Sequence, residues 1–594
     1  MGTAAAGAAA LGVAAGAASL MPKVEVATVR DKEAKAKPEA TVSRPVTLIP
    51  TTWDYSADVV VIGYGGAGVA ASIGAYDAGA SVLILEKAPQ ALAGGNTGVS
   101  GGICTTPTPL TDFITIANMM CWNEVPLDVI TATCTQITNL PNWVSSLGFS
   151  MTSGNFAWNL PLSFYQNAVS PAFCPNSPPG QVPANYIVVP PFNYPLKGTS
   201  KTGSQGGGKD FFAVLDNCRA SRNIPVMFQT PATSLIQNPN TNEIVGVVAT
   251  TWTGQSINVK ANKAVILACG GYENNEEIKH NYAPESPKNE YITFYGTPYN
   301  TGDGIYMAQS VGAKLWHMAK KEVHALANGP ASKEIGDGLV VDSLGYGFAS
   351  ATSLPGILVN RNGSRFINEY FDSGHNDNTR AWDAFVELWQ TPDGSYYCDW
   401  PNQPFYAVFD SVAMSAGPLV SSGGPNGSRY GPVHNLYNWS QDNSVELAKG
   451  WIVGPATTPQ ALGAMITCRD FFGNVVGMSA SGLASQVTAY NNMCTAGVDT
   501  QFGRAKATLL PLQKPPFYAM QLIECQTNTD GGPAHDAEVR TLDVNNNPIP
   551  RLYSPGELGS MWGGLYYGGG NVPEAIAMGR LAGANAAALT PWVA

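Results

Sequence analysis

The sequence has few charged residues and few histidines. Charged residues make up 13% of its 594 positions, acidic residues outnumber basic ones by 43 to 32, and the formal net charge is −11. Non-specific binding to the phosphate backbone of nucleic acid needs a basic surface, so this balance excludes a nucleic-acid partner of that kind. The six histidines show no metal-ligand spacing, and the sequence therefore predicts no metal site.

The ten cysteines form no pattern either. They include neither a CxxC pair nor a CxxCH motif, which excludes a covalently attached c-type haem and a zinc knuckle. We expect most of them to be buried as small apolar side chains, and some disulfide bonding stays open. No internal repeat is visible. With 44% hydrophobic residues, a chain of this length can form two or three domains around a large core.

The first 22 residues are apolar and rich in alanine and glycine. They resemble the hydrophobic stretch of a twin-arginine export signal, although no Arg-Arg pair precedes them. Their small side chains are poor material for a membrane-spanning helix, so we predict no transmembrane span. Residues 23–52 are a polar linker. We expect an extracytoplasmic, periplasmic location, and the alternative is a flexible tail on a cytoplasmic protein.

The most informative stretch of the sequence is residues 58–86. An apolar strand at 58–62 leads into Gly63-x-Gly65-x-x-Gly68, a helix of small residues follows, and a second apolar strand at 81–85 ends in Glu86. The three glycines permit the tight turn, the approach of a pyrophosphate and the close packing of helix on sheet. The helix N-terminus can bind phosphate, and an acid at this spacing can bind ribose hydroxyls. The stretch predicts a dinucleotide site.

The remaining sequence can be divided by its composition and by its expected helices and strands. Helices are predicted within 110–150, at 206–223 and from about Pro573, and residues 151–208, rich in Pro, Asn, Tyr and Gly, are predicted to be loop. Strands are predicted at 225–230, 234–238, 243–252, 263–271 and 516–524. Residues 325–505 carry no nucleotide signal. We therefore predict a leader and linker at 1–52, a nucleotide-binding domain at 53–324 and 506–594, and a capping domain at 325–505.

Six motifs occur in the order found in one family of flavoenzymes. They are DVVVIGYGGAGVAA with ILEK, GGNTGVSGG, GGYENNEEIKHNY, NTGDGIYMAQSVGAKLWHM, GILVNRNGSRFINE, and YSPGELGS with GGGNVPEAIAMGRLAG. The chain resembles the FAD-dependent fumarate reductases, urocanate reductases and 3-ketosteroid dehydrogenases, which are similar to the succinate dehydrogenase flavoprotein. The resemblance implies an α/β fold, in which a Rossmann-like FAD-binding domain carries an inserted α+β capping domain. It also implies hydride transfer between flavin N5 and a C–C bond beside a carbonyl or carboxylate.

The resemblance assigns cofactor contacts to positions of this sequence. It implies that the ADP half is held by Gly63, Gly65, Gly66, Ala67, Gly68, Glu86 and Lys87. It places Asn96, Thr97, Ser100, Gly101 and Gly102 near the flavin. Ala232 would contact the adenine side, Glu557 the ribityl chain, and Asn571 and Val572 the pyrimidine end of the ring.

Two departures from the family bear on the substrate. The dicarboxylate reductases carry a proton-donating arginine four residues after the Asn-Glu of their RFxNE motif, and here that position is Ser373. They also carry a substrate-binding arginine in the turn before the last helix, where this chain has residues 566–571, YYGGGN. A dicarboxylate needs cationic, bidentate binding. These departures disfavour fumarate or succinate as substrate.

The resemblance is closer to the ketosteroid-type members, which use tyrosines at these places. Tyr566 and Tyr567 lie in the glycine-rich turn, and Tyr370 lies three residues before Ser373. A phenol can hydrogen-bond a ketone oxygen, stabilise enolate charge or transfer a proton. We therefore predict that these three tyrosines include the catalytic residues. The alternative is that they pack the loops in which they lie.

The sequence thus predicts an FAD-dependent oxidoreductase acting on CH–CH bonds of a 3-ketosteroid or similar enone. Its expected partners are a small apolar carbonyl substrate and a separate electron donor or acceptor, which could be a cytochrome, a quinone or a soluble carrier. One alternative is a reductase of α,β-unsaturated acids of the urocanate, cinnamate or fumarate type, with Arg380 binding the carboxylate. Others are a flavin electron-transfer subunit and a nicotinamide dehydrogenase.

Overall fold

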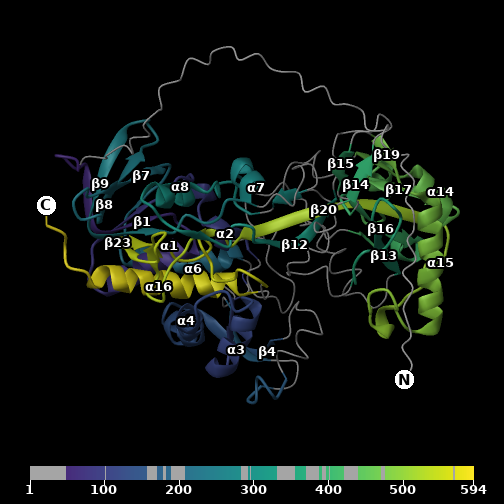
Figure 1. Cartoon of the computed structure of the whole chain (residues 1–594), viewed down its shortest axis with the longest axis horizontal. Coiled ribbons are helices and arrows are strands. Elements are labelled where there is room, and N and C mark those ends of the chain that lie inside the picture. The colour runs from purple at the N-terminus through teal and green to yellow at the C-terminus, as the bar shows by residue number, and fades with distance from the viewer. Residues whose placement is uncertain are drawn as a thin grey trace, which may run out of the picture. The chain divides into compact units, whose positions relative to one another are not determined.

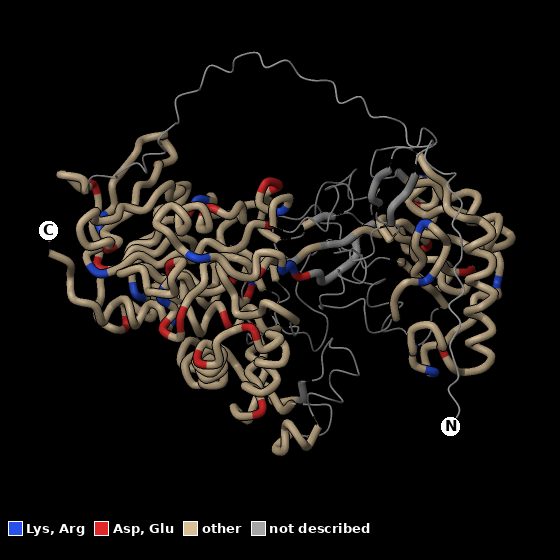
Figure 2. Tube along the Cα trace, in the orientation of Figure 1, with Lys and Arg blue, Asp and Glu red and all other residues tan. Residues whose placement is uncertain are grey.

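The computed structural model describes most of the chain after residue 48 (Figure 1). The described residues are 49–593, with gaps at 101, 103, 157–169, 178–181, 189–207, 283–291, 295, 329, 331–354, 370–386, 391–395, 400–401, 420–438, 470–474 and 566–568. Acidic and basic positions are mixed along the described chain (Figure 2). No helix among the described residues is both long enough and apolar enough to cross a membrane.

An eight-stranded sheet carries the predicted nucleotide motif. Its main path runs β22-β23-β9-β1-β2-β6, and β7 and β8 extend from β9 as an antiparallel pair. From β23 to β6, neighbouring strands in this path are parallel, and β22 pairs with β23 in the antiparallel direction. The strand bounds are β1 (Tyr55–Ile62), β2 (Val82–Leu85), β6 (Val226–Met227), β7 (Ala232–Gln237), β8 (Ile244–Thr250), β9 (Ser256–Leu267), β22 (Arg540–Leu542) and β23 (Pro548–Tyr553).

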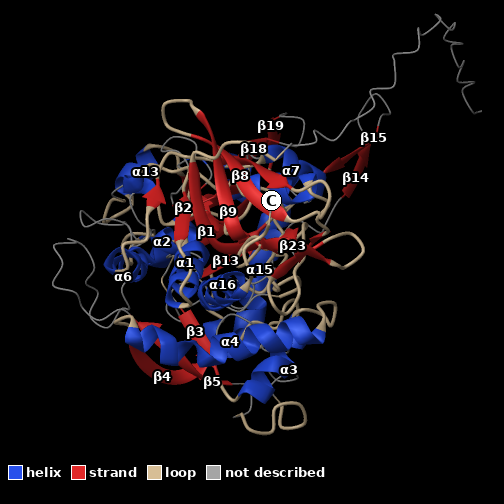
Figure 3. Ribbon diagram, turned by 90° about the vertical axis from the view of Figure 1, so that its left-hand side faces the viewer, coloured by secondary structure: helices blue, strands red, loops and turns tan. Residues whose placement is uncertain are grey.

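The parallel part of this sheet is covered on both faces. Val59, Val60 and Val61 of β1 are all fully buried, as expected for a central parallel strand. Helices α1 (Gly66–Asp77) and α16 (Asn571–Ala588) pack together against one face (Figure 3). Residues of α8 (Asp303–Ser310) pack in the hydrophobic cluster on the other face. The strands, the first helix and the last helix predicted from the sequence are thus confirmed, and β9 starts earlier than expected.

Small residues explain how closely α1 and α16 pack. A Cβ atom added to Gly579 would collide with the carbonyl oxygen of Ala67, and one added to Gly583 would collide with that of Ala71. This pairing, 67 with 579 and 71 with 583, shows that the two helices run in the same direction. Their N-termini therefore lie at the same edge of the sheet, where β1, β9 and β23 end.

The segment between the first helices and β6 is partly a sheet, which corrects one expectation. Residues 151–208 were expected to be loop, but β4 (Ser150–Phe156) and β5 (Val182–Val188) form an antiparallel sheet with β3 (Cys104–Pro107), in which β5 lies between β3 and β4. The proline-rich composition concealed these strands, because β5 pairs with strands that lie far from it in the sequence. The helices expected around them are confirmed as α3 (Leu110–Met120), α4 (Leu127–Ser146) and α6 (Gly208–Ser221).

A second sheet is built around β20 (Phe517–Thr529), which is longer than the expected 516–524. It contains β10 (Ile292–Phe294), β12 (Lys321–Asn328), β13 (Gly356–Val359), β16 (Phe405–Asp410) and β17 (Ile452–Ala456). Helices α14 (Pro459–Met465) and α15 (Ala480–Ala496) pack with this sheet in one hydrophobic cluster. The sheet thus takes strands from residues outside 325–505 as well as inside, and the expected domain boundaries stay a prediction.

Short elements complete the described chain. They are α2 (Gly95–Val99), α7 (Glu276–Tyr282), α12 (Ser411–Met414), α13 (Ser444–Ala448), β11 (Leu315–Trp316), β14 (Glu387–Gln390), β15 (Tyr396–Asp399), β18 (Thr467–Arg469), β19 (Val475–Gly477) and β21 (Gly532–Pro533). The eight cysteines that the structure describes in full are free thiols, and five of them are buried.

Candidate active site

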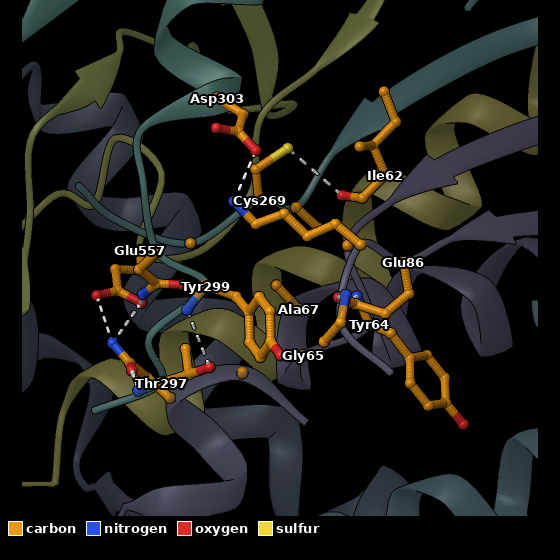
Figure 4. Close-up of a pocket in the computed structure, with 18 of the residues that line it drawn as sticks. Ile62, Tyr64, Gly65, Ala67, Glu86, Cys269, Thr297, Tyr299, Asp303 and Glu557 are labelled. Carbon is orange, nitrogen blue, oxygen red and sulfur yellow. Dashed lines mark hydrogen bonds and ion pairs between the residues drawn. The ribbon is translucent and has the colours of Figure 1, made fainter. Parts of the chain in front are cut away.

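A cavity lies where the carboxyl ends of β1, β2 and β9 meet the start of α1 (Figure 4). Gly63 has a φ of +103°, and a Cβ atom there would collide with the carbonyl oxygen of Ala268. A Cβ atom at Gly68 would collide with the carbonyl oxygen of Gly63. Side chains larger than hydrogen are therefore excluded at both positions. Gly63, Gly65, Gly66 and Ala67 line the cavity, whereas Gly68 packs behind the turn.

Glu86 fixes the turn from the end of the neighbouring strand. Its Oε2 accepts a hydrogen bond of 2.7 Å from the amide of Tyr64, and its Oε1 accepts one of 2.6 Å from the amide of Ala88. Burial raises the pKa of Glu86, and these amide hydrogen bonds oppose the rise. Glu86 faces the cavity, and each carboxylate oxygen can accept a further bond, as ribose hydroxyls require.

The cavity also contains a positive charge near the turn. Lys87 Nζ donates to Asp303 Oδ2 at 2.7 Å and to Thr301 Oγ1 at 2.6 Å. Lys87 and Asp303 both line the cavity, and Ala232 at the start of β7 lines it too. Asp303 was not among the predicted site residues. The motif NTGDG, noted only as a family pattern, was the signal that could have found it.

Two predicted residues on the short helix α2 connect the turn to the rest of the cavity. Thr97 Oγ1 accepts a hydrogen bond of 3.2 Å from the amide of Gly66. Asn96 Oδ1 accepts one of 3.0 Å from the amide of Thr297, and its Nδ2 donates to Glu557 at 2.8 Å. Figure 4 shows the ring of Tyr299 between Glu557 and Gly65. Thr297 and Tyr299 line the cavity and were missed by the sequence analysis.

The other predicted residues of the NTGVSGG segment that the structure describes are Ser100 and Gly102. Ser100 follows α2, donates from its hydroxyl to the carbonyl of Thr97 at 2.9 Å and accepts from the amide of Gly102 at 3.1 Å. Neither is among the residues that line the cavity. Gly101 lies outside the described residues.

Three carboxyl groups gather at the end of the cavity away from Glu86. Glu557 lines the cavity, and its Oε1 accepts from the amide of Thr529 at 3.4 Å. Glu273 accepts from the same amide at 3.0 Å, and Asp530 is the next residue along the chain. Burial raises the pKa of Glu273 and that of Glu557, and burial raises the pKa of Asp530 to about 7. Sequence reasoning found only Glu557, because the three acids follow three different strands.

The two predicted residues at the start of α16 adjoin this group. Asn571 Nδ2 donates to Asp530 Oδ1 at 3.4 Å. Val572 packs against the hydrophobic core and does not line the cavity. The glycine-rich turn before them is anchored at both ends, because Leu565 donates from its amide to Met120 at 2.7 Å and Gly569 accepts from Thr105 at 3.1 Å.

The three predicted catalytic tyrosines, Tyr370, Tyr566 and Tyr567, lie outside the described residues, as do Ser373 and Arg380. The residues just before Tyr370 are held in place by a buried network. Arg365 donates twice to Glu369, at 2.7 Å in each bond, and also donates to Asp499 at 3.0 Å. The roles of the tyrosines stay predictions.

Comparisons with known proteins agree with a flavin in this cavity. The family model described as FAD binding domain matches residues 58–572. The chain is 25% identical to the digoxin reductase of Eggerthella lenta, over 98% of this chain and 96% of that protein. It is 26% identical to the urocanate reductase of the same organism, over 95% of this chain and 79% of that protein.

A solved structure with a similar fold is the 3-ketosteroid Δ1-dehydrogenase of Sterolibacterium denitrificans, in complex with 1,4-androstadiene-3,17-dione. Its TM-score is 0.68 at 21% identity, covering 90% of this chain and 99% of that one. The expected fold class, an α/β flavoenzyme fold, is thereby confirmed. The polar groups that line the cavity fit FAD. A helix N-terminus and Lys87 can donate to the phosphates, and Glu86 can accept from a ribose.

Proposed function

Since the chain belongs to the family described as FAD binding domain, we propose that it exchanges hydride with an uncharged, apolar enone such as a 3-ketosteroid. Its cofactor is FAD, and it is an oxidoreductase acting on a C–C or C=C bond beside a carbonyl. The substrate is the proposed part. Direction is set by the electron partner, which either supplies or removes two electrons.

The observation that carries this proposal is the acidic character of the cavity end far from Glu86. Glu273 and Asp530 are 1% and 0% exposed there, and Glu557 faces the cavity. Lys320, the nearest base to Asp530, is itself ion-paired with Glu322 at 3.1 Å. A dianionic substrate bound next to this end of the cavity would face carboxylates in a poorly solvated site, which costs free energy without a compensating cation. A neutral carbonyl compound avoids this cost.

The sequence supports the same substrate class. Both arginine positions of the dicarboxylate reductases are replaced here, by Ser373 and by the arginine-free turn 566–571. In the proposed reaction, FAD held by the glycine turn, Glu86 and Lys87 would supply or accept the hydride exchanged with the β-carbon. Tyr566 or Tyr567 hydrogen-bonds the carbonyl oxygen, and Tyr370 is the candidate for proton transfer at the α-carbon. The relative named digoxin reductase gives independent support for an uncharged substrate.

A second candidate is reduction of an unsaturated acid. It is favoured by the relative named urocanate reductase, which is 26% identical over 95% of this chain. In that case Arg380 would bind the single carboxylate. A monoanion would meet less repulsion from the acidic end of the cavity than a dianion, so this candidate is compatible with the same electrostatics.

The test compares neutral enones with unsaturated acids on the FAD-loaded enzyme. Reduced enzyme is mixed with 3-ketosteroids, other cyclic enones, urocanate, cinnamate and fumarate, and flavin reoxidation is followed by absorbance. We expect reoxidation by the neutral enones, and reoxidation by the acids alone would overturn the proposal. Tyr566→Phe and Tyr567→Phe should identify the catalytic phenol by a loss of roughly 10²–10⁴-fold in kcat. Tyr76→Phe, on an exposed tyrosine, is the matched control.

We further propose that a separate cytochrome, quinone or soluble carrier exchanges electrons with the flavin, and that residues 1–52 direct the protein out of the cytoplasm. The first proposal is supported by the absence of a c-type haem motif from the sequence, and the second by the apolar leader. Fractionation of cells that express the full chain or residues 53–594 tests the location. Equal cytoplasmic recovery of both would refute export.

A further inference from the structure

The three acids at the end of the cavity away from Glu86, called the acid cluster below, are Glu273, Asp530 and Glu557. Each follows the carboxyl end of a different strand: Glu273 comes after β9, Asp530 after β20 and Glu557 after β23. Three carboxylates at one place repel one another unless protons or cations intervene. A cluster of this kind therefore holds protons whose number depends on the charge nearby.

Shared donors show how close Glu273 and Glu557 are. The side-chain amide of Asn96 donates to Glu273 Oε1 at 3.2 Å and to Glu557 Oε1 at 2.8 Å. The backbone amide of Thr529 also donates to both. Hydrogen bonding between the two carboxyl groups raises the pKa of Glu557, and burial raises that of both. One proton shared by the pair accounts for this geometry.

Asp530 is fully buried and has few short hydrogen bonds. Its Oδ1 accepts two long bonds of 3.4 Å, from Asn528 and Asn571, and the side chains of Glu322 and Ser560 also interact with it. Its Oδ2 makes no hydrogen bond by distance and angle. A buried carboxylate is stable only with good donors, so this site binds a proton readily.

Charged and titratable groups surround Asp530 on every side that the structure describes. The acids among them are Glu273, Glu322, Glu557 and Glu574, the base is Lys320, and the neutral titratable groups are Cys121 and Tyr272. Lys320 and Glu322 form an ion pair whose side chains are 1% and 0% exposed, so they largely neutralise each other. Burial is the main cause that favours the protonated form of Asp530, Lys320 opposes it, and the charge of Glu273 favours it further.

We propose that the acid cluster takes up one proton, at Asp530, when the FAD in the cavity receives two electrons. An external reductant supplies the two electrons, and water supplies two protons. One proton, with the two electrons, would give the bound FAD the hydrogen that it later transfers as hydride, and the other proton forms an O–H bond on the Asp530 carboxylate. When the hydride passes to one carbon of a C=C bond, the Asp530 O–H bond breaks, and that proton becomes available to the second carbon. The acid cluster thus stores beside the cofactor the proton that the reduction consumes.

The physical cause is charge. Two electrons bring negative charge into the cavity that Glu557 lines, next to carboxylates that are already short of donors. A carboxylate near added negative charge binds a proton more tightly. Above a pH of about 7, Asp530 is ionised in the resting enzyme. In this range the binding of a proton to Asp530 on reduction can be measured as proton uptake.

The test is the pH dependence of the flavin midpoint potential in the FAD-loaded enzyme. The potential is measured from flavin absorbance with redox mediators and dithionite, between about pH 7 and 8.5. One additional proton coupled to a two-electron transfer steepens the slope by about 30 mV per pH unit. We expect Asp530→Asn to have a slope shallower than wild type by this amount. Glu273→Gln removes a neighbouring carboxyl group that raises the pKa of Asp530, so its slope should be shallower than wild type as well.

The matched control is Asp543→Asn, because Asp543 lies in a turn exposed to solvent and accepts from the amides of Asn545 and Asn547. Its slope should equal that of wild type. Equal slopes in wild type, Asp530→Asn and Glu273→Gln would overturn the proposal. If Asp530→Asn does not retain FAD, the slope of Glu273→Gln decides. The measurement needs FAD but no substrate, so its failure is distinct from failure of the proposed enone activity.

Discussion

Replacing Arg365 with methionine should loosen the loop at residues 499–504. Arg365 is 0% exposed in its side chain and donates to two buried carboxylates, Glu369 and Asp499. Loss of the guanidinium leaves both acids buried, with Arg504 at 3.5 Å from Glu369. Removing one partner of a buried pair costs about 3–5 kcal/mol, because the charge left behind is not solvated.

The structure identifies where this loss can be measured. Asp499 accepts hydrogen bonds from three backbone amides, those of Gln501 at 2.9 Å, Phe502 at 3.2 Å and Arg504 at 3.1 Å. Hydrogen exchange at these amides reports the free energy of local opening. Since 1.4 kcal/mol is a factor of ten, we expect Arg365→Met to speed their exchange by roughly a hundredfold or more.

The stabilisation by the Arg365–Asp499 pair should depend on pH in a direction that can be measured. Burial alone would raise the pKa of Asp499, but the hydrogen bonds and charge of Arg365 outweigh it and hold the pKa below its ordinary value. The stability that the pair contributes is therefore present above the unfolded-state pKa and lost as the pH falls through the folded-state pKa. The difference between Arg365→Met and wild type should shrink toward acid pH.

The control is Arg540→Met, which removes an exposed arginine paired with Asp536 and Glu538. A surface pair of this kind contributes about 0–1 kcal/mol, so exchange near it should change less than tenfold. If Arg365→Met also changes exchange at 501–504 by less than tenfold, the buried network does not stabilise this loop and the reasoning is wrong.

Two further substitutions test the nucleotide end and the core. Gly68→Ala should reduce FAD retention on gel filtration, because its Cβ would collide with the carbonyl of Gly63. The control Gly98→Ala should retain FAD, because its Cβ would contact only Ala93 O at 3.9 Å. Equal retention in the two variants would refute the steric argument. Burial raises the pKa of Glu574 to about 8, so the folded state holds a proton that the unfolded state releases, and stability should fall between about pH 4.5 and 8. Glu574→Gln should flatten that part of the thermal-stability profile, and an unchanged profile would contradict the assignment.

Local patterns predicted the nucleotide end of the site well. The strand, glycine turn, helix and second strand at 55–86 are formed by neighbouring residues, so their periodicity and glycine spacing are sufficient. Glu86, Lys87, Asn96 and Thr97 all line the cavity as expected. Asp303 could not be placed in the same way, because its contact with Lys87 joins residues more than 200 positions apart.

Non-local pairing explains what the sequence analysis missed. The strands β4 and β5 have a composition typical of loops, and they become a sheet only because β5 pairs with both β3 and β4. The acid cluster has the same origin, since Glu273, Asp530 and Glu557 are neighbours only because β9, β20 and β23 end near one another. No spacing rule in a single sequence relates these three positions.

The parallel packing of α1 and α16 connects the two ends of the site. Because Gly579 and Gly583 contact the backbone of α1, the N-termini of both helices are fixed at the same edge of the sheet. Each N-terminus carries partial positive charge, α1 at the glycine turn and α16 at Asn571 beside Asp530. At α1 this partial charge is available to the cofactor phosphates. At α16 the ionised carboxylate of Asp530 competes with the flavin for the partial charge. A proton on Asp530 ends that competition, so the partial charge of α16 is then free to stabilise electrons on the cofactor.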